Sequence, residues 1–299
     1  MSDWSEQGRP RVHVATRVPE EVEQALARDF ELVSAAFGAA GIVVTPALTV
    51  DAAYLDAAGP ELRIIANYAV GTDNFDLDAA RSRGVVVSNT PDVLTNATAE
   101  LAVGLMLALV RRIGEGDRMI RRRDPWQIAP EFMLGTGLAD KEVLVVGPGR
   151  IGRRVAELVG AHGARPTFAG RADDLGALLS GADVVSLHCP LTPETHHLID
   201  SHALAAMKPT AILVNTSRGQ VVDEGALVAA LQIGSLAGAA LDVYEFEPDV
   251  AKELLALENV VLTPHLGSAT REARVAMGML CVEALRAVLL EGRRPRNAV

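Results

Sequence analysis

The amino-acid sequence predicts an α/β protein built from two doubly wound parallel-sheet domains, one inserted into the other. Short runs rich in β-branched residues alternate with helical stretches twice along the chain, before residue 95 and again from residue 142 onwards. Two long helical patterns lie at the ends of the second set. Alternation of this kind favours a mostly parallel sheet with helices on both faces.

The first set contains predicted strands with predicted helices between them. The strands are expected at Arg11–Ala15, Gly41–Thr45, Leu62–Ala66 and Val85–Ser88. Helices are expected, for example, at Pro19–Asp29 and Leu77–Arg83. The order of these elements predicts a first α/β unit.

The second set repeats this alternation over a longer stretch. Its strands are expected at Val143–Val146, Pro166–Ala169, Asp183–His188, Ala211–Asn215, Ala237–Val243 and Val260–Thr263. Its helices are expected at Ile151–His162, Leu175–Ser180, Ser201–Ala206 and Glu224–Gln232. This pattern predicts a second α/β unit in tandem with the first.

Two longer helical patterns, Asn96–Arg121 and Ser268–Leu290, flank the second set. This placement indicates that the second unit is inserted into the first, and that the C-terminal helix returns to the N-terminal unit. We therefore expect one domain of residues 1–97 with 268–299, and another of residues 98–267.

Length, composition and charge limit the classes of function. A chain of 299 residues with 49% apolar and 22% charged residues is typical of a globular protein of two domains. Its formal net charge of -10 repels the phosphates of nucleic acid and of anionic lipid headgroups. We therefore expect neither a nucleic acid nor a membrane as partner.

No targeting segment is expected. The first eleven residues, MSDWSEQGRPR, contain no apolar stretch typical of a secretory signal. The longest apolar run, Leu101–Val110, is too short to span a bilayer and is expected to be a buried helix. Cys189 and Cys281 form no CxxC pair and indicate no disulfide framework. These features predict a cytoplasmic location.

A glycine-rich turn follows the predicted strand KEVLVV and leads into a helical pattern. It reads Gly147-Pro148-Gly149-Arg150-Ile151-Gly152. In such a turn Gly147 permits the tight bend, Gly149 lets the backbone approach a pyrophosphate, and Gly152 lets helix and strand pack closely. The pyrophosphate then lies on the N–H groups at the positive end of the helix. In this context the motif predicts dinucleotide binding, with a structural glycine turn as the alternative.

The residues after the next strand bear on which dinucleotide is bound. An acidic residue at this strand end usually binds the ribose hydroxyls of NAD, but here Gly170 takes that place and Arg171 follows. An arginine can neutralise a 2′-phosphate, so NADP(H) is favoured over NAD(H). Asp173 and Asp174 come directly afterwards, and their negative charges weaken the prediction of NADP(H).

Three later strands end in polar residues that suit hydride-transfer chemistry. Because the carboxyl ends of parallel strands share one edge of the sheet, Arg218, Glu247 and His265 are expected along that edge. Hydride transfer to a ketone leaves an alkoxide, which a histidine can protonate, and a neighbouring carboxylate favours the imidazolium and fixes the ring. Arginine offers a planar fork of donors to a carboxylate and a nearby carbonyl oxygen. Asp242 can accept from the nicotinamide amide.

Each of these residues also has a plain structural interpretation. A single histidine after a strand is more often structural, a single arginine is more often in a surface ion pair, and Glu-Pro is a common turn. The coincidence of all three behind the glycine turn favours the catalytic interpretation. The other histidines form no HxxxH or HExxH with a suitable partner, so no metal is expected.

The chain resembles the D-isomer-specific 2-hydroxyacid dehydrogenase family over nearly its whole length, and within it the glyoxylate/hydroxypyruvate reductases. The resemblance is carried by IIANYAVGTDNFDLDAARSRGVVVSNTPDVLTNATAELAVGLMLAL, VLVVGPGRIGRRVAEL, DVVSLHCPLTPETHHLID, MKPTAILVNTSRGQVVDEGALVAAL, GAALDVYEFEP and NVVLTPHLGSAT. It implies two Rossmann-like or flavodoxin-like domains, with the dinucleotide domain inserted into the substrate domain. It also implies an oxidoreductase that transfers a hydride between NAD(P)H and C2 of a small 2-oxo or 2-hydroxy acid.

The resemblance implies a role for each matching residue. Arg218 would bind the substrate carboxylate and carbonyl, Glu247 would pair with His265, and His265 would be the proton donor. Backbone N–H groups of the loop containing Val70 and Gly71 would bind the substrate carboxylate. The implied cofactor contacts are Thr98, Gly147, Gly149, Arg150, Ile151, Gly152, Gly170, Arg171, Pro190, Thr216, Asp242 and Gly267.

The resemblance further implies a homodimer, built largely through the dinucleotide domain and the helix AELAVGLMLALV. Two stretches are shorter than is usual in the family: the crossover after Arg171, of about a dozen residues, and Ser34–Pro60. Other 2-hydroxy acids, phosphoglycerate-like compounds or phosphite stay open as substrates. A dinucleotide-sensing regulatory protein, like the transcriptional corepressors that share this fold, is the alternative from another class of function.

Overall fold

The computed structural model describes residues 8–299. The residues before Gly8, which hold most of the stretch searched for a secretory signal, lie outside the described part. The chain folds into two compact units. Unit 1 comprises the chain up to Leu94 together with Ala269–Val299, and unit 2 comprises Thr95–Ser268. The sequence predicts breaks after residue 97 and before residue 268.

Unit 1 is built on a parallel five-stranded sheet in the order β2-β1-β3-β4-β5. The strands are β1 (Arg11–Val14), β2 (Glu31–Val33), β3 (Gly41–Val44), β4 (Ile64–Asn67) and β5 (Val86–Ser88). Every residue of β3 and β4 is buried, as expected for central strands of a parallel sheet covered on both faces. The four predicted strands are confirmed. β2 was not predicted from the sequence, because this short edge strand has no run of β-branched residues.

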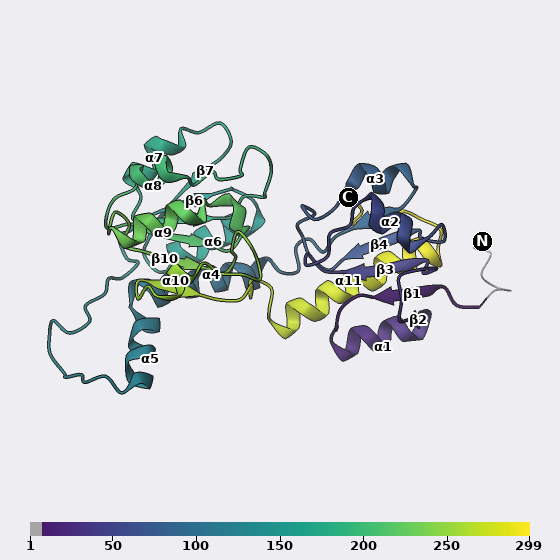
Figure 1. Ribbon diagram of the computed structural model, residues 1–299, viewed down its shortest axis with the longest axis horizontal. Coiled ribbons are helices and arrows are strands. Elements are labelled where there is room, and N and C mark those ends of the chain that lie inside the picture. Colours follow the sequence, from purple (N-terminus) through teal and green to yellow (C-terminus); the bar gives the residue numbers. More distant parts are fainter. Residues whose placement is uncertain (1–7) are drawn as a thin grey trace. The chain divides into compact units, whose positions relative to one another are not determined.

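Helices cover both faces of the sheet in unit 1 (Figure 1). α1 (Glu20–Asp29) packs against α11 (Arg271–Leu289), which lies on β3 and β4. α2 (Ala52–Ala58) and α3 (Leu77–Ser82) pack together over a separate apolar cluster that includes Leu55 and Ala80. A Cβ atom at Gly41 would lie 2.5 Å from Leu285, so this glycine permits the close approach of α11.

Unit 2 is built on a parallel six-stranded sheet in the order β11-β10-β9-β8-β6-β7. The strands are β6 (Glu142–Val146), β7 (Arg165–Ala169), β8 (Val184–Leu187), β9 (Ile212–Asn215), β10 (Gly238–Leu241) and β11 (Val260–Leu262). All six predicted strands are confirmed. The chain leaves β6 for β7 on one side and returns to β8 on the other. The crevice between the carboxyl ends of β6 and β8 is therefore the point where such sheets bind ligands.

Two layers of helices enclose this second sheet. α4 (Thr95–Val110) and α6 (Arg150–Ala161) pack together on one face, over an apolar cluster that includes Val145 and Val214. α7 (Leu175–Gly181), α8 (Ser201–Ala206) and α9 (Glu224–Gln232) cover the other face, and α10 (Lys252–Leu255) is a single turn before β11. The short α7 provides the crossover that the brief stretch after Arg171 allows.

The single helix predicted over Asn96–Arg121 is wrong, because the chain breaks after α4. Arg112 has a left-handed backbone with φ of 54°, and α5 (Ile113–Arg122) begins after it. The N–H of Thr136 donates to the carbonyl of Val110 at 2.9 Å and so caps the end of α4. A Cβ atom at Gly135 would lie 2.3 Å from that oxygen, which makes this approach possible for glycine alone.

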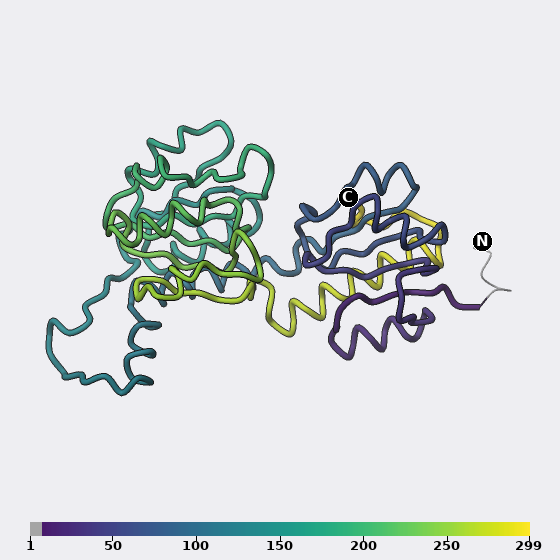
Figure 2. The backbone as a smooth tube through the Cα atoms, in the orientation of Figure 1, coloured from purple at the N-terminus to yellow at the C-terminus, as the bar shows by residue number. Residues whose placement is uncertain are grey.

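α5 and residues 123–137, here called the projecting segment, extend away from the rest of unit 2 (Figures 1 and 2). No residue of α5 is buried. Within residues 8–299, no helix is long and apolar enough to cross a membrane. The cytoplasmic location predicted from the sequence stays a prediction.

Candidate active site

The glycine turn after β6 has the geometry that the motif predicts. Gly147 has a φ of 98°, and a Cβ atom there would lie 2.6 Å from the backbone N of Cys189 at the end of β8. A Cβ atom at Gly152 would lie 2.3 Å from the carbonyl oxygen of Gly147. These two glycines therefore hold β6, β8 and α6 together at the switch point of the sheet.

Gly149 differs from the other two glycines of the turn. A Cβ atom built on it meets no atom within 4 Å, and no side chain caps the first turn of α6. Arg150 and Ile151, which follow, are the first residues of this helix. The open space beside Gly149 and the N–H groups of the helix start together fit an anionic phosphate group.

The end of β7, where the ribose of a dinucleotide is expected, contains a carboxylate from further along the chain. The N–H of Gly170 donates to Oδ2 of Asp173 at 2.7 Å, whereas Asp174 caps α7 through the N–H of Ala177. A Cβ atom at Gly170 would meet only Asp173 and Pro148, at 3.5 and 3.9 Å. The strand end therefore has room for a side chain and one acidic neighbour, and Arg171 beside it is exposed.

Two buried polar atoms near the carboxyl ends of β8 and β9 have no hydrogen-bond partner among the described residues. These are Oγ1 of Thr216 and Nδ1 of His188. Burial lowers the pKa of His188 to about 4, so its ring is neutral, and Nε2 pairs with Oγ of Ser186 at 2.8 Å. Buried polar atoms without a partner at the carboxyl ends of such strands are typical of a site completed by a ligand.

His265 and Glu247 are brought together, as the sequence predicts. Nδ1 of His265 lies 2.8 Å from Oε2 of Glu247, and the other carboxylate oxygen accepts the N–H of Tyr244 at 3.0 Å. Burial alone would raise the pKa of Glu247. The hydrogen bond and charge of His265, the Tyr244 N–H and the charge of Arg218 outweigh it and hold the pKa below its usual value. Glu247 is therefore ionised near neutral pH, and Nε2 of His265 faces away from this bond.

Asp242 holds the loop that carries His265. It is fully buried and its carboxylate accepts the N–H groups of Leu266 and Gly267, both at 2.7 Å, and the hydroxyl of Thr263 at 2.6 Å. Its backbone carbonyl also accepts the N–H of His265, whose φ is 54°. Three of its roughly four lone-pair positions are thus occupied within the loop. Sequence reasoning missed this role, because loop N–H groups leave no mark in a sequence.

Arg218 lies three residues after the end of β9, and its backbone is fixed by Asn215. The amide of Asn215 donates to the carbonyl of Arg218 at 2.8 Å and accepts from both the N–H and the hydroxyl of Ser217. A Cβ atom at Gly219 would lie 1.9 Å from the carbonyl carbon of Tyr244, so the loops after β9 and β10 touch here. The structure thereby brings Arg218 and Glu247 onto neighbouring loops. The buried Asn215 is a supporting residue that the sequence analysis did not single out.

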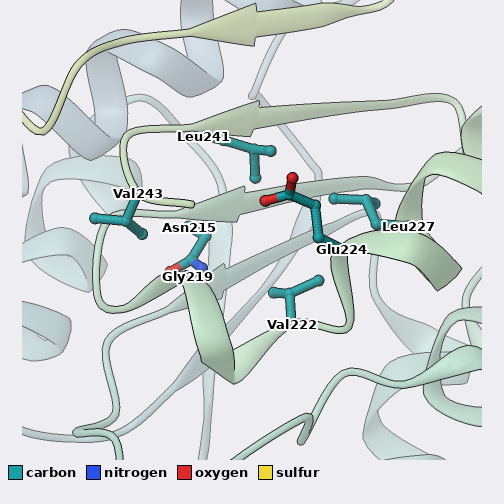
Figure 3. A pocket seen from close by; sticks show the side chains of 7 residues that line it. All are labelled: Asn215, Gly219, Val222, Glu224, Leu227, Leu241 and Val243. Atoms are coloured by element: carbon teal, nitrogen blue, oxygen red, sulfur yellow. The ribbon is translucent and has the colours of Figure 1, made fainter. Parts of the chain in front are cut away.

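A small cavity lies behind these loops (Figure 3). It holds about 10 Å³, which is room for one water molecule and not for a substrate. Figure 3 shows Glu224 among its lining side chains, and the Glu224 carboxylate accepts the N–H groups of Glu245 and Ala251 at 3.1 and 3.2 Å. The cavity therefore belongs to the support of the loop after β10.

The remaining predicted residues lie in both units. Thr98 of α4 lies beside Gly267, whose added Cβ would be 3.5 Å away, and Pro190 follows β8. Val70 and Gly71 belong to unit 1, where their carbonyl oxygens accept from the Asn89 and Asn67 amides at 2.9 and 2.7 Å. Their predicted contact with a substrate stays a prediction.

The fold and the glycine turn of unit 2 define a dinucleotide-binding α/β protein with a paired histidine and glutamate at the ends of its strands. The profile of the D-isomer specific 2-hydroxyacid dehydrogenase NAD-binding domain matches residues 103–267. The chain belongs to the D-isomer-specific 2-hydroxyacid dehydrogenase family and binds a nicotinamide dinucleotide in this domain. The family resemblance found in the sequence is confirmed.

Relatives and solved structures agree with this assignment. The chain is 46% identical to a glyoxylate reductase of Thermococcus litoralis, over 80% of this chain and 77% of that protein. A crystal structure of a protein from Thermus thermophilus is 43% identical to this chain, with a TM-score of 0.90. The match covers 97% of this chain and 99% of the Thermus thermophilus chain. An NADPH-dependent glyoxylate/hydroxypyruvate reductase of Sinorhizobium meliloti, solved with NADP and malonate, has 33% identity and a TM-score of 0.86. The match covers 98% of this chain and 97% of the Sinorhizobium meliloti chain.

Proposed function

We propose that this protein reduces C2 of a small 2-oxo acid with NAD(P)H, and that glyoxylate and hydroxypyruvate are its substrates. The main support is the bond of 2.8 Å between His265 and Glu247, with the Arg218 charge acting on the same carboxylate. Relatives named glyoxylate reductases support the choice of substrate. The dinucleotide would be held by Gly149, by the start of α6 and by the orphaned hydroxyl of Thr216.

In the proposed reaction, Arg218 binds and orients the substrate. Its guanidinium offers a planar fork of donors that matches a carboxylate and the adjacent carbonyl oxygen. The positive charge also stabilises the negative charge that develops on that oxygen. When bound, the nicotinamide supplies the hydride that reaches C2.

His265 supplies the proton that completes the reduction. Glu247 accepts the Nδ1–H of His265, so the ring is oriented and Nε2 is left to act on the substrate. The protonated ring gives the Nε2 proton to the alkoxide oxygen as the hydride arrives, and in the reverse direction neutral Nε2 takes the proton from the hydroxyl. Asp242 fixes the loop in which this ring lies.

A steady-state comparison of substrates tests this function. NADPH and NADH oxidation would be followed with glyoxylate, hydroxypyruvate, pyruvate, 3-phosphohydroxypyruvate and, in the direction of cofactor reduction, phosphite. We expect the highest kcat/KM with glyoxylate or hydroxypyruvate. Cofactor binding without turnover of any of these compounds would contradict the proposal and favour a dinucleotide-sensing protein.

NADP(H) is the cofactor that we propose for this protein, because no side chain projects from position 170 and Arg171 follows it. Replacing Gly170 with aspartate adds a negative charge where the 2′-phosphate is expected, in a position with room for the side chain. We expect kcat/KM for NADPH to fall at least about tenfold relative to NADH. Gly170→Ala is the matched control, because it adds the Cβ without the charge.

A variant that removes the charge of Asp173 is a second test of the preference for NADPH. Asp173→Asn keeps an acceptor for the Gly170 N–H and removes the charge. We expect it to improve the use of NADPH. An unchanged NADPH preference in Gly170→Asp would mean that the ribose lies elsewhere.

We further propose a homodimer formed through the dinucleotide domain and α4, with a contribution from the projecting segment. This segment exposes apolar side chains, and Ile128 is 96% exposed. Several large exposed apolar side chains on one segment are more typical of an interface than of a free surface. We expect light scattering to give twice the chain mass of 31.6 kDa for the native protein and the monomer mass for Ile120→Glu/Ile128→Glu. Ile233→Glu, at an exposed isoleucine in unit 2 outside the segment, should stay dimeric. A native monomer would contradict the proposal.

A further inference from the structure

A group of metal-ligating side chains lies in unit 2 among residues that the proposed reaction does not use. His196 and His197 belong to the loop between β8 and α8, and Glu245 belongs to the loop after β10. One ligand atom from each of the three lies within 4.8 Å of the other two. Two imidazole nitrogens and a carboxylate oxygen at such distances can reach a single ion.

The two histidines are held in a defined arrangement. Their rings stack with centroids 4.1 Å apart and planes 28° apart. His197 has a left-handed backbone with φ of 51°, which is uncommon for a residue other than glycine, and its N–H donates to the carbonyl of Gln220 at 2.8 Å. Nε2 of His197 lies 2.8 Å from Oε1 of Glu245. The loop therefore presents both rings toward the same carboxylate.

Glu245 is held by hydrogen bonds from several directions, so its carboxylate has a defined orientation. Its second oxygen accepts the N–H of Glu224 at 3.2 Å, and its own N–H donates to the Glu224 carboxylate at 3.1 Å. Its carbonyl accepts the amide of Gln220 at 2.9 Å. Its side chain is 12% exposed. Hydrogen bonds behind a ligand orient it and raise its affinity for a metal.

We propose that His196, His197 and Glu245 bind a divalent transition-metal ion of the zinc type. Imidazole nitrogen suits zinc, copper and nickel, and two histidines with one carboxylate leave a further position for water. In the metal-free protein Nε2 of His197 is hydrogen-bonded to Oε1 of Glu245, and the ion would take the place of this bond. The bound ion would join the loop after β8 to the loop that continues into Glu247.

Calorimetric titration of Zn²⁺ into the full chain, without a histidine tag and after dialysis against a chelator, tests this site. We expect one ion per chain. His196→Ala removes one ligand and leaves the hydrogen bond between His197 and Glu245 intact, so the fold is preserved. We expect this variant and Glu245→Gln each to lose at least about tenfold in affinity. His202→Ala is the matched control, because it removes an exposed histidine outside the group.

Thermal unfolding gives a second readout that does not depend on catalysis. An ion that binds only the folded protein raises Tm, so Zn²⁺ should raise the Tm of the native protein and of His202→Ala more than that of His196→Ala. The absence of saturable binding, or equal affinity in the native protein, His196→Ala and Glu245→Gln, would overturn the proposal. Neither result depends on whether the chain reduces 2-oxo acids.

Discussion

Replacing Arg218 with alanine is expected to lower kcat/KM for glyoxylate by about a thousandfold. The proposed contacts of its guanidinium are a carboxylate and the oxygen on which negative charge develops. Loss of a single hydrogen-bond donor at such an oxygen costs about 10²–10³ in rate, equivalent to about 3–4 kcal/mol in the barrier. Loss of the substrate carboxylate contact adds to this effect, so both kcat and KM should worsen.

The surroundings of Arg218 make this variant informative. The backbone of the loop is fixed by Asn215, which binds the Arg218 carbonyl and Ser217, and these bonds do not involve the guanidinium. The tight contact of Gly219 with Tyr244 is also a backbone feature. We therefore expect the alanine variant to fold and to bind the dinucleotide with unchanged affinity, so that only substrate binding and turnover are impaired.

Two further variants separate charge from geometry. Arg218→Lys keeps the charge but loses the planar fork, and we expect an activity between those of the native protein and Arg218→Ala. Arg81→Ala, at an exposed arginine of unit 1 paired with Asp78, is the control and should be as active as the native protein. Full activity of Arg218→Ala with every 2-oxo acid would remove Arg218 from the proposed mechanism.

The parts of this site that the sequence predicts are those determined by short stretches of backbone. The bend at Gly147 and the packing at Gly152 depend on a strand, a turn and a helix that are continuous in the chain. The pairing of Glu247 with His265 was predictable for a related reason, because parallel strands bring the residues that follow them to one edge. Local periodicity therefore located the elements, and the rule for parallel strands placed their ends together.

The features that the sequence did not predict depend on contacts between distant segments. α4 ends at Val110 because Thr136 caps it, and neither residue has a sequence signal for this contact. The cofactor contact of Asp242 stays a prediction, whereas the hydrogen bonds of its carboxylate with loop N–H groups depend on contacts that only the folded chain makes. His196 and Glu245 are likewise brought together by loops of irregular conformation.

Replacing His265 with alanine is expected to lower kcat for the reduction by about 10²–10⁴, because the alkoxide then has no positioned proton donor. The substrate carboxylate contacts remain, so KM should change less than kcat. Glu247→Gln should lower kcat less than His265→Ala does, since its amide oxygen can still accept the Nδ1–H of His265. The measurement is the steady-state rate of each variant with glyoxylate, with Glu253→Gln, an exposed glutamate of α10, as the control.

The pH dependence distinguishes a proton donor from a structural histidine. The lowered pKa of Glu247 keeps it ionised near neutral pH, and its charge is lost only as the pH falls through that lowered value. Reduction requires the protonated ring, so its kcat/KM should fall as the pH rises, whereas oxidation of the hydroxy acid requires the neutral ring and should rise. Protonation of Glu247 below its lowered pKa removes the charge beside His265, so activity should also fall at low pH, and Glu247→Gln should lack this fall. Profiles of the same shape in both directions, or an unchanged fall at low pH in Glu247→Gln, would mean that this pair does not transfer the proton.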